Sequence, residues 1–305
     1  MSSEAWHRPR EVARALALRY ATGIRDNLRV VLNWRPGKKD LAEIVLIASA
    51  LPLYYLVRGQ AHERIQDAVQ RGLDIVQFEK SLGIFWEVEL QGWILPHDWL
   101  VTILNAFYLY GHLPIIGALA VWMYFWHRPQ YLLMRNAFLI SGAIGLVIFL
   151  NFPTAPPRLL GVHGADLGFV DTILMEYHKS RPDTPSFFVN EYAAMPSLHL
   201  GWNLLVGISV WLATKNLLMR GFAVLMPVAM YVDIVLTANH YIVDGIAGFG
   251  VMLIGLFIAV AGRWGVSRIF AKRREGGRPS WVGWLLWLCG VPDGQARRRP
   301  LGEPA

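Results

Sequence analysis

The sequence predicts an all-α fold: a polytopic membrane helix bundle of about six transmembrane helices, with further interfacial amphipathic helices. Hydrophobic residues make up 54% of the 305 residues and charged residues only 17%, whereas soluble domains carry about 25% charged residues. Six apolar stretches approach the about 20 residues that cross the hydrocarbon core of a bilayer. They are 41–57, 100–126, 136–152, 195–214, 221–239 and 240–262.

The last two stretches are nearly continuous in the sequence. Because an unbroken helix of about 40 residues would overrun a membrane, we expect a turn near 237–240. The chain then divides into a basic cytoplasmic or interfacial N-terminal segment, 1–40, a six-span membrane domain, 41–262, and a basic cytoplasmic tail, 263–305, with a short Trp-rich interfacial segment.

The positions of the cations predict the orientation, since Lys and Arg near the ends of spans stay on the cytoplasmic side. With both termini inside, the outer loops hold only seven of the 29 Lys and Arg. The inner segments, 1–39, 127–135, 215–220 and 263–305, hold the other 22. We therefore expect an integral membrane protein, of the plasma membrane, with both termini in the cytoplasm.

Shorter amphipathic segments are predicted at the membrane surface. Residues 11–34 have apolar side chains at roughly helical spacing among basic ones, which fits either an interfacial helix or a disordered basic tail. The apolar-rich residues 281–288 are too few to span, and fit either an interfacial anchor or a sticky tail. The first outer loop has the apolar spacing of a surface helix at Ile65, Val69, Leu73, Val76 and Leu82.

Cysteine content and charge exclude several classes of protein. The single cysteine, Cys289, excludes an intramolecular disulfide framework and a cysteine-rich zinc module. The net charge of +7 comes from the tails and short loops rather than from one polar domain. This distribution favours anionic lipid headgroups over nucleic acid as the partner.

Polar residues gather at three predicted helix ends, and ionisable residues at membrane depth are costly enough to indicate function. The third stretch ends in a proline-rich exit that holds Arg158 near the surface. Its guanidinium can bind a phosphate through paired donors, or reach out to lipid headgroups. The fourth stretch opens with Pro196, Ser197 and His199. The unpaired amides of such a helix start attract an anion, although Pro-Ser is also ordinary at helix starts.

The sixth stretch opens with His240 and Asp244, which are four residues apart and so share one helix face. Asp244 can accept the proton of one imidazole nitrogen and leave the other with a free lone pair, which makes a nucleophile. A buried histidine satisfied by a carboxylate would have the same spacing. The predicted topology puts all three groups at the outer boundary of the membrane, which favours one shared site.

These residues resemble the type-2 phosphatidic-acid phosphatase superfamily, whose motifs run Lys-x6-Arg-Pro, Pro-Ser-Gly-His and Ser-Arg-x5-His-x3-Asp. The matching positions are Arg158 in the first motif, 196–199 in the second, and His240 with Asp244 in the third. The resemblance covers roughly 136–262.

The departures from these motifs are informative. Asn151, Leu159 and Leu198 replace the lysine, the proline and the glycine, and Asp233-Ile234 stand at the Ser-Arg positions. These forms resemble the inositol phosphorylceramide synthase and inositolphosphotransferase branch, which also lacks the arginine of the third motif. The lost cations weaken the expected phosphate clamp.

The resemblance implies a lipid phosphotransferase without cofactor or metal, acting on the outer face of the membrane. It would move an inositol-phosphate-like headgroup from a phospholipid donor to a lipid or sugar alcohol through a phosphohistidine. His240 would be the nucleophile, Asp244 would hold its tautomer, and His199 would serve the leaving and incoming alcohols as acid and base. Arg158 and Ser197 would bind phosphoryl oxygens.

Four acids are further candidates for contact with a polyol headgroup. Asp233 could accept hydrogen bonds from hydroxyls, or make a structural polar contact within the bundle. Asp166, Asp171 and Glu191 of the second outer loop could line a headgroup pocket, or simply be solvated.

Three other functions use similar residues. With water as the acceptor, the same site would make a lipid phosphate phosphatase. A transporter would place charges near mid-depth on broken helices inside paired repeats, but the charges here cluster at one boundary and the sequence shows no repeat. A metal hydrolase would use His199, His240 and Asp244 as ligands.

Overall fold

The computed structural model describes residues 25, 27–58, 64–173, 192–271 and 280–292. These residues contain no strand, only one isolated bridge between Thr154 and Ala193, so the predicted all-α class is confirmed. The elements are α2 (Lys38–Arg58), α3 (Ile65–Leu82), α4 (Glu87–Ile94), α5 (Asp98–Ala106), the π-helical η3 (Phe107–Gly111), α6 (His112–Trp126), α7 (Arg128–Asn151), α8 (Pro157–Leu160), the 3₁₀-helical η4 (Gly161–His163), α10 (Leu198–Ala213), α11 (Leu217–Leu236), α12 (Ile242–Ala271) and α13 (Ser280–Leu288). Residues 11–24 of the basic segment, and Glu191, lie outside the described part.

Within the described residues, four helical stretches are long and apolar enough to cross a membrane. They are Asp98–Trp126, Arg128–Asn151, Leu217–Leu236 and Ile242–Phe270. The stretch predicted at 195–214 is the apolar helix α10, which has 16 residues. The chain is therefore a polytopic membrane helix bundle, as predicted.

The predicted turn near 237–240 is confirmed, because α11 ends at Leu236 and α12 begins at Ile242. Ala238 has a φ of 53°, a left-handed conformation that costs a non-glycine residue about 1 kcal/mol or more. The backbone amides of Asn239 and His240 both donate to the Ile234 carbonyl oxygen, at 3.0 Å. This tight turn places His240 two residues before α12, which begins at Ile242.

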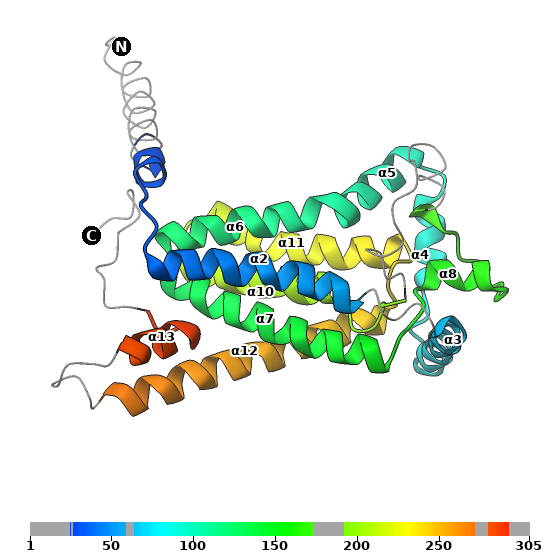
Figure 1. Cartoon of the computed structure of the whole chain (residues 1–305). Helices are drawn as coiled ribbons and strands as arrows, with labels where there is room; N and C mark the ends of the chain where they lie inside the picture. Colours follow the sequence, from blue (N-terminus) through cyan, green and yellow to red (C-terminus); the bar gives the residue numbers. More distant parts are fainter. Residues whose placement is uncertain (1–24, 26, 59–63, 174–191, 272–279, 293–305) are drawn as a thin grey trace, which may run out of the picture. The chain divides into compact units, whose positions relative to one another are not determined.

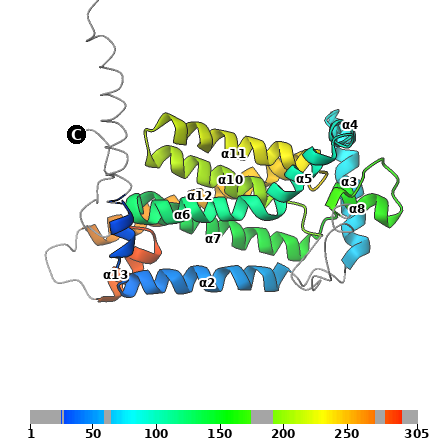
Figure 2. The same cartoon turned by 90° about the horizontal axis from the view of Figure 1, so that it is seen from above.

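The chain divides into two compact units, Met1–Ile44 with Gly294–Ala305, and Val45–Asp293. In the larger unit α6, α7, α10, α11 and α12 run side by side, and α3, α4 and α8 lie together at one end of them (Figures 1 and 2). The prediction of a helix between the first two apolar stretches is confirmed by α3. At the other end lies α13, where Arg135 donates to the carbonyl oxygens of Trp287 and Leu288.

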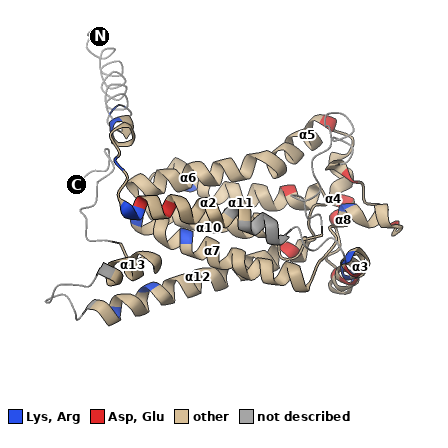
Figure 3. Cartoon of the chain, viewed as in Figure 1, with Lys and Arg blue, Asp and Glu red and all other residues tan. Residues whose placement is uncertain are grey.

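Charged residues of this larger unit gather toward the ends of the long helices (Figure 3). Along α12, Asp244 lies in the first turn, whereas Arg263 and Arg268 lie near the other end. Because a helix of 30 residues is about 45 Å long, the acid and the arginines are separated by most of a bilayer.

Glycines allow α10 and α12 to cross in close contact. A Cβ added at Gly201 would lie 2.7 Å from the Gly248 carbonyl oxygen, and a Cβ added at Gly248 would overlap the Ser197 carbonyl oxygen. Small residues let membrane helices approach to backbone contact in this way. The Ser197 amide also donates to the Asp244 carbonyl oxygen at 2.9 Å. The crossing therefore joins the start of α10 to the start of α12.

Candidate functional site

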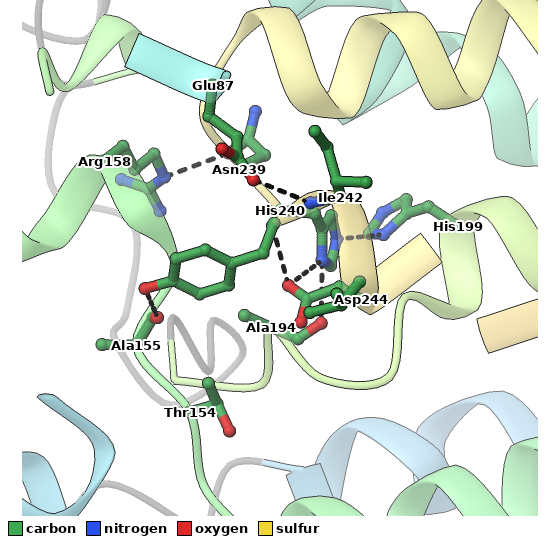
Figure 4. Close-up of polar contacts among 12 residues, drawn as sticks. Glu87, Thr154, Ala155, Arg158, Ala194, His199, Asn239, His240, Ile242 and Asp244 are labelled. Atoms are coloured by element: carbon green, nitrogen blue, oxygen red, sulfur yellow. Dashed lines mark hydrogen bonds and ion pairs between the residues drawn. The ribbon is translucent and has the colours of Figure 1, made fainter. Parts of the chain in front are cut away.

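The His240 side chain is 3% exposed and its Nδ1 faces two acceptors. Nδ1 lies 2.8 Å from the Ala194 carbonyl oxygen and 3.3 Å from Asp244 Oδ2 (Figure 4). Since both partners can only accept, we assign the proton to Nδ1, which leaves a lone pair on Nε2. Nε2 is therefore the nitrogen that can act as a nucleophile.

The loop that presents the Ala194 carbonyl is pinned by the isolated bridge. The Thr154 amide donates to the Tyr192 carbonyl oxygen at 2.8 Å, and the Ala194 amide donates to the Thr154 carbonyl oxygen at 3.1 Å. Thr154 follows α7, whereas Ala194 leads into α10. The bridge thus fixes the acceptor of His240 relative to two different helices.

His199 lies in the first turn of α10, beside the lone pair of His240. Its Nδ1 is 3.4 Å from His240 Nε2 (Figure 4). Because Nε2 is the acceptor in this contact, the proton lies on His199 Nδ1. The pair therefore places a possible proton donor next to a possible nucleophile.

The start of α12 is occupied by carboxylates. The Tyr241 amide donates to Asp244 Oδ2 at 3.0 Å, the Ile242 amide donates to Glu87 Oε1 at 3.0 Å, and the Val243 amide donates to Glu79 Oε1 at 2.9 Å. Negative groups stabilise the positive end of a helix. This helix start is consequently already filled by carboxyl groups of the protein.

The start of α10 is different. Ser197 is its N-cap residue, yet the Ser197 side chain makes no capping hydrogen bond. Its Oγ is buried and has no hydrogen-bond partner within the described residues. First-turn amides have no partner inside their own helix and attract anions. Of the two helix starts, α10 is the better place for a phosphoryl group.

Arg158 of α8 is held by the turn that precedes His240. Its amide donates to the Ala238 carbonyl oxygen at 3.0 Å, and its Nε donates to Asn239 Oδ1 at 3.0 Å (Figure 4). Its Nη1 forms an ion pair with Asp171 Oδ2 at 2.7 Å, and both side chains are less than 10% exposed. Arg158 is therefore anchored inside the protein and does not extend toward lipid headgroups.

A cavity of about 430 Å³ adjoins this ion pair. Two of the acids predicted as headgroup contacts, Asp166 and Asp171, line it together with Arg158. Phe169 adds an aromatic side chain to the same wall. The cavity thus combines acceptors, a cation and an apolar face next to the turn that carries His240.

Asp233 and Asn151 take no part in the contacts of His240, His199 and Arg158 described above. Asp233 in α11 is fully buried, and neither carboxylate oxygen has a hydrogen-bond partner within the described residues. Asn151, at the position of the missing lysine, donates its Nδ2 to the Val147 carbonyl oxygen at 2.7 Å in its own helix. Asn151 therefore contributes no cation and turns back to α7.

Two residues beside the histidine pair were missed from the sequence, Tyr108 and His112. The Tyr108 ring lies 4.4 Å from the His199 ring and 6.3 Å from the His240 ring, and the His112 ring lies 4.6 Å from the His199 ring. His112 Nδ1 also contacts the Tyr108 carbonyl oxygen at 2.9 Å. The one available signal was an ionisable residue, His112, inside the apolar stretch 100–126.

A local irregularity brings these two residues to the site. Tyr108 belongs to the π-helical turn η3, and His112 is the first residue of α6. Such turns insert a residue into a helix, rotate the side chains that follow, and are frequent at functional sites. Across the described ranges, no group of three or more His, Cys, Asp and Glu is placed to hold a metal ion.

Comparison with known families identifies one that matches this chain. The model of the PAP2 superfamily matches residues 73–258, more than half of the chain and including every candidate site residue named above. No curated protein and no solved structure matches the chain. The match and the apolar helices fit a membrane lipid phosphatase or phosphotransferase. The chain belongs to the PAP2 superfamily.

Proposed function

We propose that this protein is an integral-membrane lipid phosphotransferase of the inositol phosphorylceramide synthase-like kind. It transfers an inositol-phosphate-like headgroup from a phospholipid to a lipid or sugar alcohol through a phosphohistidine. The observation that carries the proposal is the polarised His240, with Nδ1 bonded to two acceptors and Nε2 directed at His199.

In the first step His240 Nε2 attacks the phosphorus of the donor phosphodiester and forms an N–P bond. The P–O bond to the lipid alcohol breaks, and His199 gives its proton to the departing oxygen. Asp244 and the Ala194 carbonyl stabilise the imidazole while it carries the headgroup phosphate. The diacylglycerol-type alcohol leaves, and His199 is left as a base.

In the second step the acceptor hydroxyl gives its proton to His199, and its oxygen attacks the phosphorus. The N–P bond breaks and returns the electron pair to His240 Nε2. One phosphodiester has been exchanged for another, and both histidines regain their starting protonation. Ser197 and the first-turn amides of α10 support the phosphoryl oxygens in both steps.

The environment of the site favours a bulky headgroup over a simple phosphate. Asn151 is turned to its own helix, and Arg158 is partly neutralised by Asp171. A phosphate monoester dianion would be held weakly by such a clamp, whereas a diester carries one charge less. The acids around the neighbouring cavity supply acceptors for the hydroxyls of a polyol.

The proposal also assigns the site to one side of the membrane. The arginines of α12 lie near its far end from Asp244, and cations are retained on the cytoplasmic side. The site then opens to the outer face of the plasma membrane, and both termini are cytoplasmic. The partners are the phospholipid donor and the alcohol acceptor, both supplied from the membrane or the outer solution.

The test is to incubate the purified protein in liposomes with phosphatidylinositol and candidate acceptors, and to identify products by mass spectrometry. A new phosphodiester lipid that depends on acceptor supports the proposal. Free inositol phosphate or phosphate, with no transfer product, would instead identify water as the acceptor and a phosphatase- or phospholipase-like reaction. Uptake of substrate by liposomes with His240→Ala protein would indicate a transporter.

Treatment with a chelator distinguishes the proposed phosphotransferase from a metal hydrolase. Full activity after exhaustive chelation agrees with a phosphohistidine route, whereas activity lost on chelation and restored by zinc contradicts it.

A further inference from the structure

Two glutamates from outside the long-helix bundle hold the start of α12. Glu87 is the first residue of α4, and Glu79 lies in the last turn of α3. They accept the amides of Ile242 and Val243, at 3.0 and 2.9 Å, across 155 and 164 residues of sequence (Figure 4 shows the Glu87 contact). Both side chains are fully buried. The second and third residues after His240 are therefore fixed by these two carboxyl groups.

Buried acids in such a place are costly unless something offsets their charge. The helix start offers partial positive charge to each Oε1, but neither Oε2 has a hydrogen-bond partner within the described residues. The other titratable groups that act on the pair are Asp244 of α12, Tyr241 of the preceding turn and Tyr231 of α11. Not one of them is a cation.

Protonation of Glu79 removes the repulsion among these acids. Burial first, and the adjacent Glu87 carboxyl second, raise the pKa of Glu79 to about 9. At neutral pH Glu79 is then uncharged, so its repulsion with Glu87 and Asp244 is absent. Its Oε1 remains an acceptor for the Val243 amide in either protonation state.

We propose that Glu79 and Glu87 are positioning residues for phosphoryl transfer: their side chains clamp the first amides of α12 and so hold His240 and Asp244 in register. This inference rests on the proposed function. The Val243 amide by itself favours a charged Glu79, but loss of the proton also puts a second negative charge beside Glu87 and near Asp244, and the repulsion drives the two carboxylates of the clamp apart. Asp244 shares this first turn, so its contact with His240 Nδ1 loosens too.

The experiment measures kcat and KM between pH 6 and pH 10 with the full chain in lipid nanodiscs. Glu79→Ala removes the acceptor and lowers kcat about tenfold at pH 7, while KM for the donor changes less than twofold. In the wild type we expect kcat to fall near pH 9, where Glu79 ionises. Glu79→Gln keeps the acceptor and cannot ionise, so this fall should move up by at least one pH unit. Glu89→Gln, an exposed acid of the same helix as Glu87, leaves the profile unchanged.

An alkaline limb that is identical in Glu79→Gln and wild type overturns the inference, and so does a Glu79→Ala variant with wild-type kcat. A Glu79→Ala variant that does not fold leaves the Glu79→Gln profile as the deciding measurement. The proposed function fails separately: if His240→Ala retains turnover in the same assay, the phosphohistidine route is wrong, whatever the Glu79 variants do.

Discussion

His240 Nε2 and His199 Nδ1 lie 3.4 Å apart, although 41 positions separate the two residues in the sequence. A phosphorus atom ready for attack sits about 3–3.5 Å from its nucleophile, and the leaving oxygen must also reach His199. The gap between the two nitrogens is too small for both, so we expect the rings to separate when a lipid binds.

Replacement of either histidine should abolish turnover. We expect His240→Ala and His199→Ala to lower kcat by about 10³-fold or more, because each residue acts in both half-reactions of the proposed mechanism. Thermal unfolding in detergent should stay near that of the wild type. His97→Ala, at an exposed position, is the matched control. Wild-type activity in either of the first two variants would refute the assignment of the pair.

Tyr108 should orient His199 through its ring rather than through its hydroxyl. Since the two rings are 4.4 Å apart and tilted by 30°, we expect Tyr108→Ala to lower kcat about tenfold and Tyr108→Phe to keep most of it. Tyr110→Ala, in the same π-helical turn but 53% exposed, should have little effect. Equal losses in Tyr108→Phe and Tyr108→Ala would point to the hydroxyl instead.

The helix crossing at Gly248 should tolerate no side chain. A Cβ there meets the Ser197 carbonyl, whereas a Cβ at Gly250 meets nothing within 4 Å. We expect Gly248→Ala to destabilise the protein by about 1–3 kcal/mol, and to lower activity because Ser197 and Asp244 are pushed apart. Gly250→Ala should match the wild type in thermal unfolding and turnover. Equal behaviour of the two variants would show that the backbone contact is unimportant.

The stability of the protein should fall as the pH rises toward 9. The pKa of Glu79 is raised from its ordinary value of 4.5 to about 9, so between these values the folded state holds a proton that the unfolded state has lost. The free energy of unfolding therefore decreases with pH across this window. We expect the melting temperature to drop more between pH 6 and pH 9 in the wild type than in Glu79→Gln. Parallel curves would contradict a protonated Glu79.

The sequence was sufficient to predict the helices and the turn between α11 and α12, because long apolar runs and the thickness of a bilayer constrain both. The contact between His240 and Asp244 was also predicted, but its reason was wrong: His240 precedes α12, which begins at Ile242, so the two residues meet without sharing a helix face. The stretch predicted at 195–214 was too long. The helix α10 has 16 residues, because its N-cap is Ser197 and the residues before it form a loop.

The contacts of Glu79 and Glu87 with α12, and the position of Tyr108 beside His199, could not be predicted. Glu79 and Glu87 meet α12 across more than 150 residues, and no local pattern encodes such a contact. The apolar spacing of residues 65–82 indicated a surface helix, whereas α3 also buries the acid Glu79. Tyr108 reaches His199 through a π-helical turn, which regular helical periodicity does not anticipate.

The most direct test of the account is to trap the covalent intermediate. The protein is mixed with phosphatidylinositol labelled in its phosphate, quenched in alkali, which preserves phosphohistidine, and digested for mass spectrometry. We expect the labelled headgroup phosphate on the peptide that contains His240, and its absence from the His240→Ala variant. Sustained turnover by the wild type with label on another residue, or with no labelled peptide and an active His240→Ala variant, would contradict the central claim.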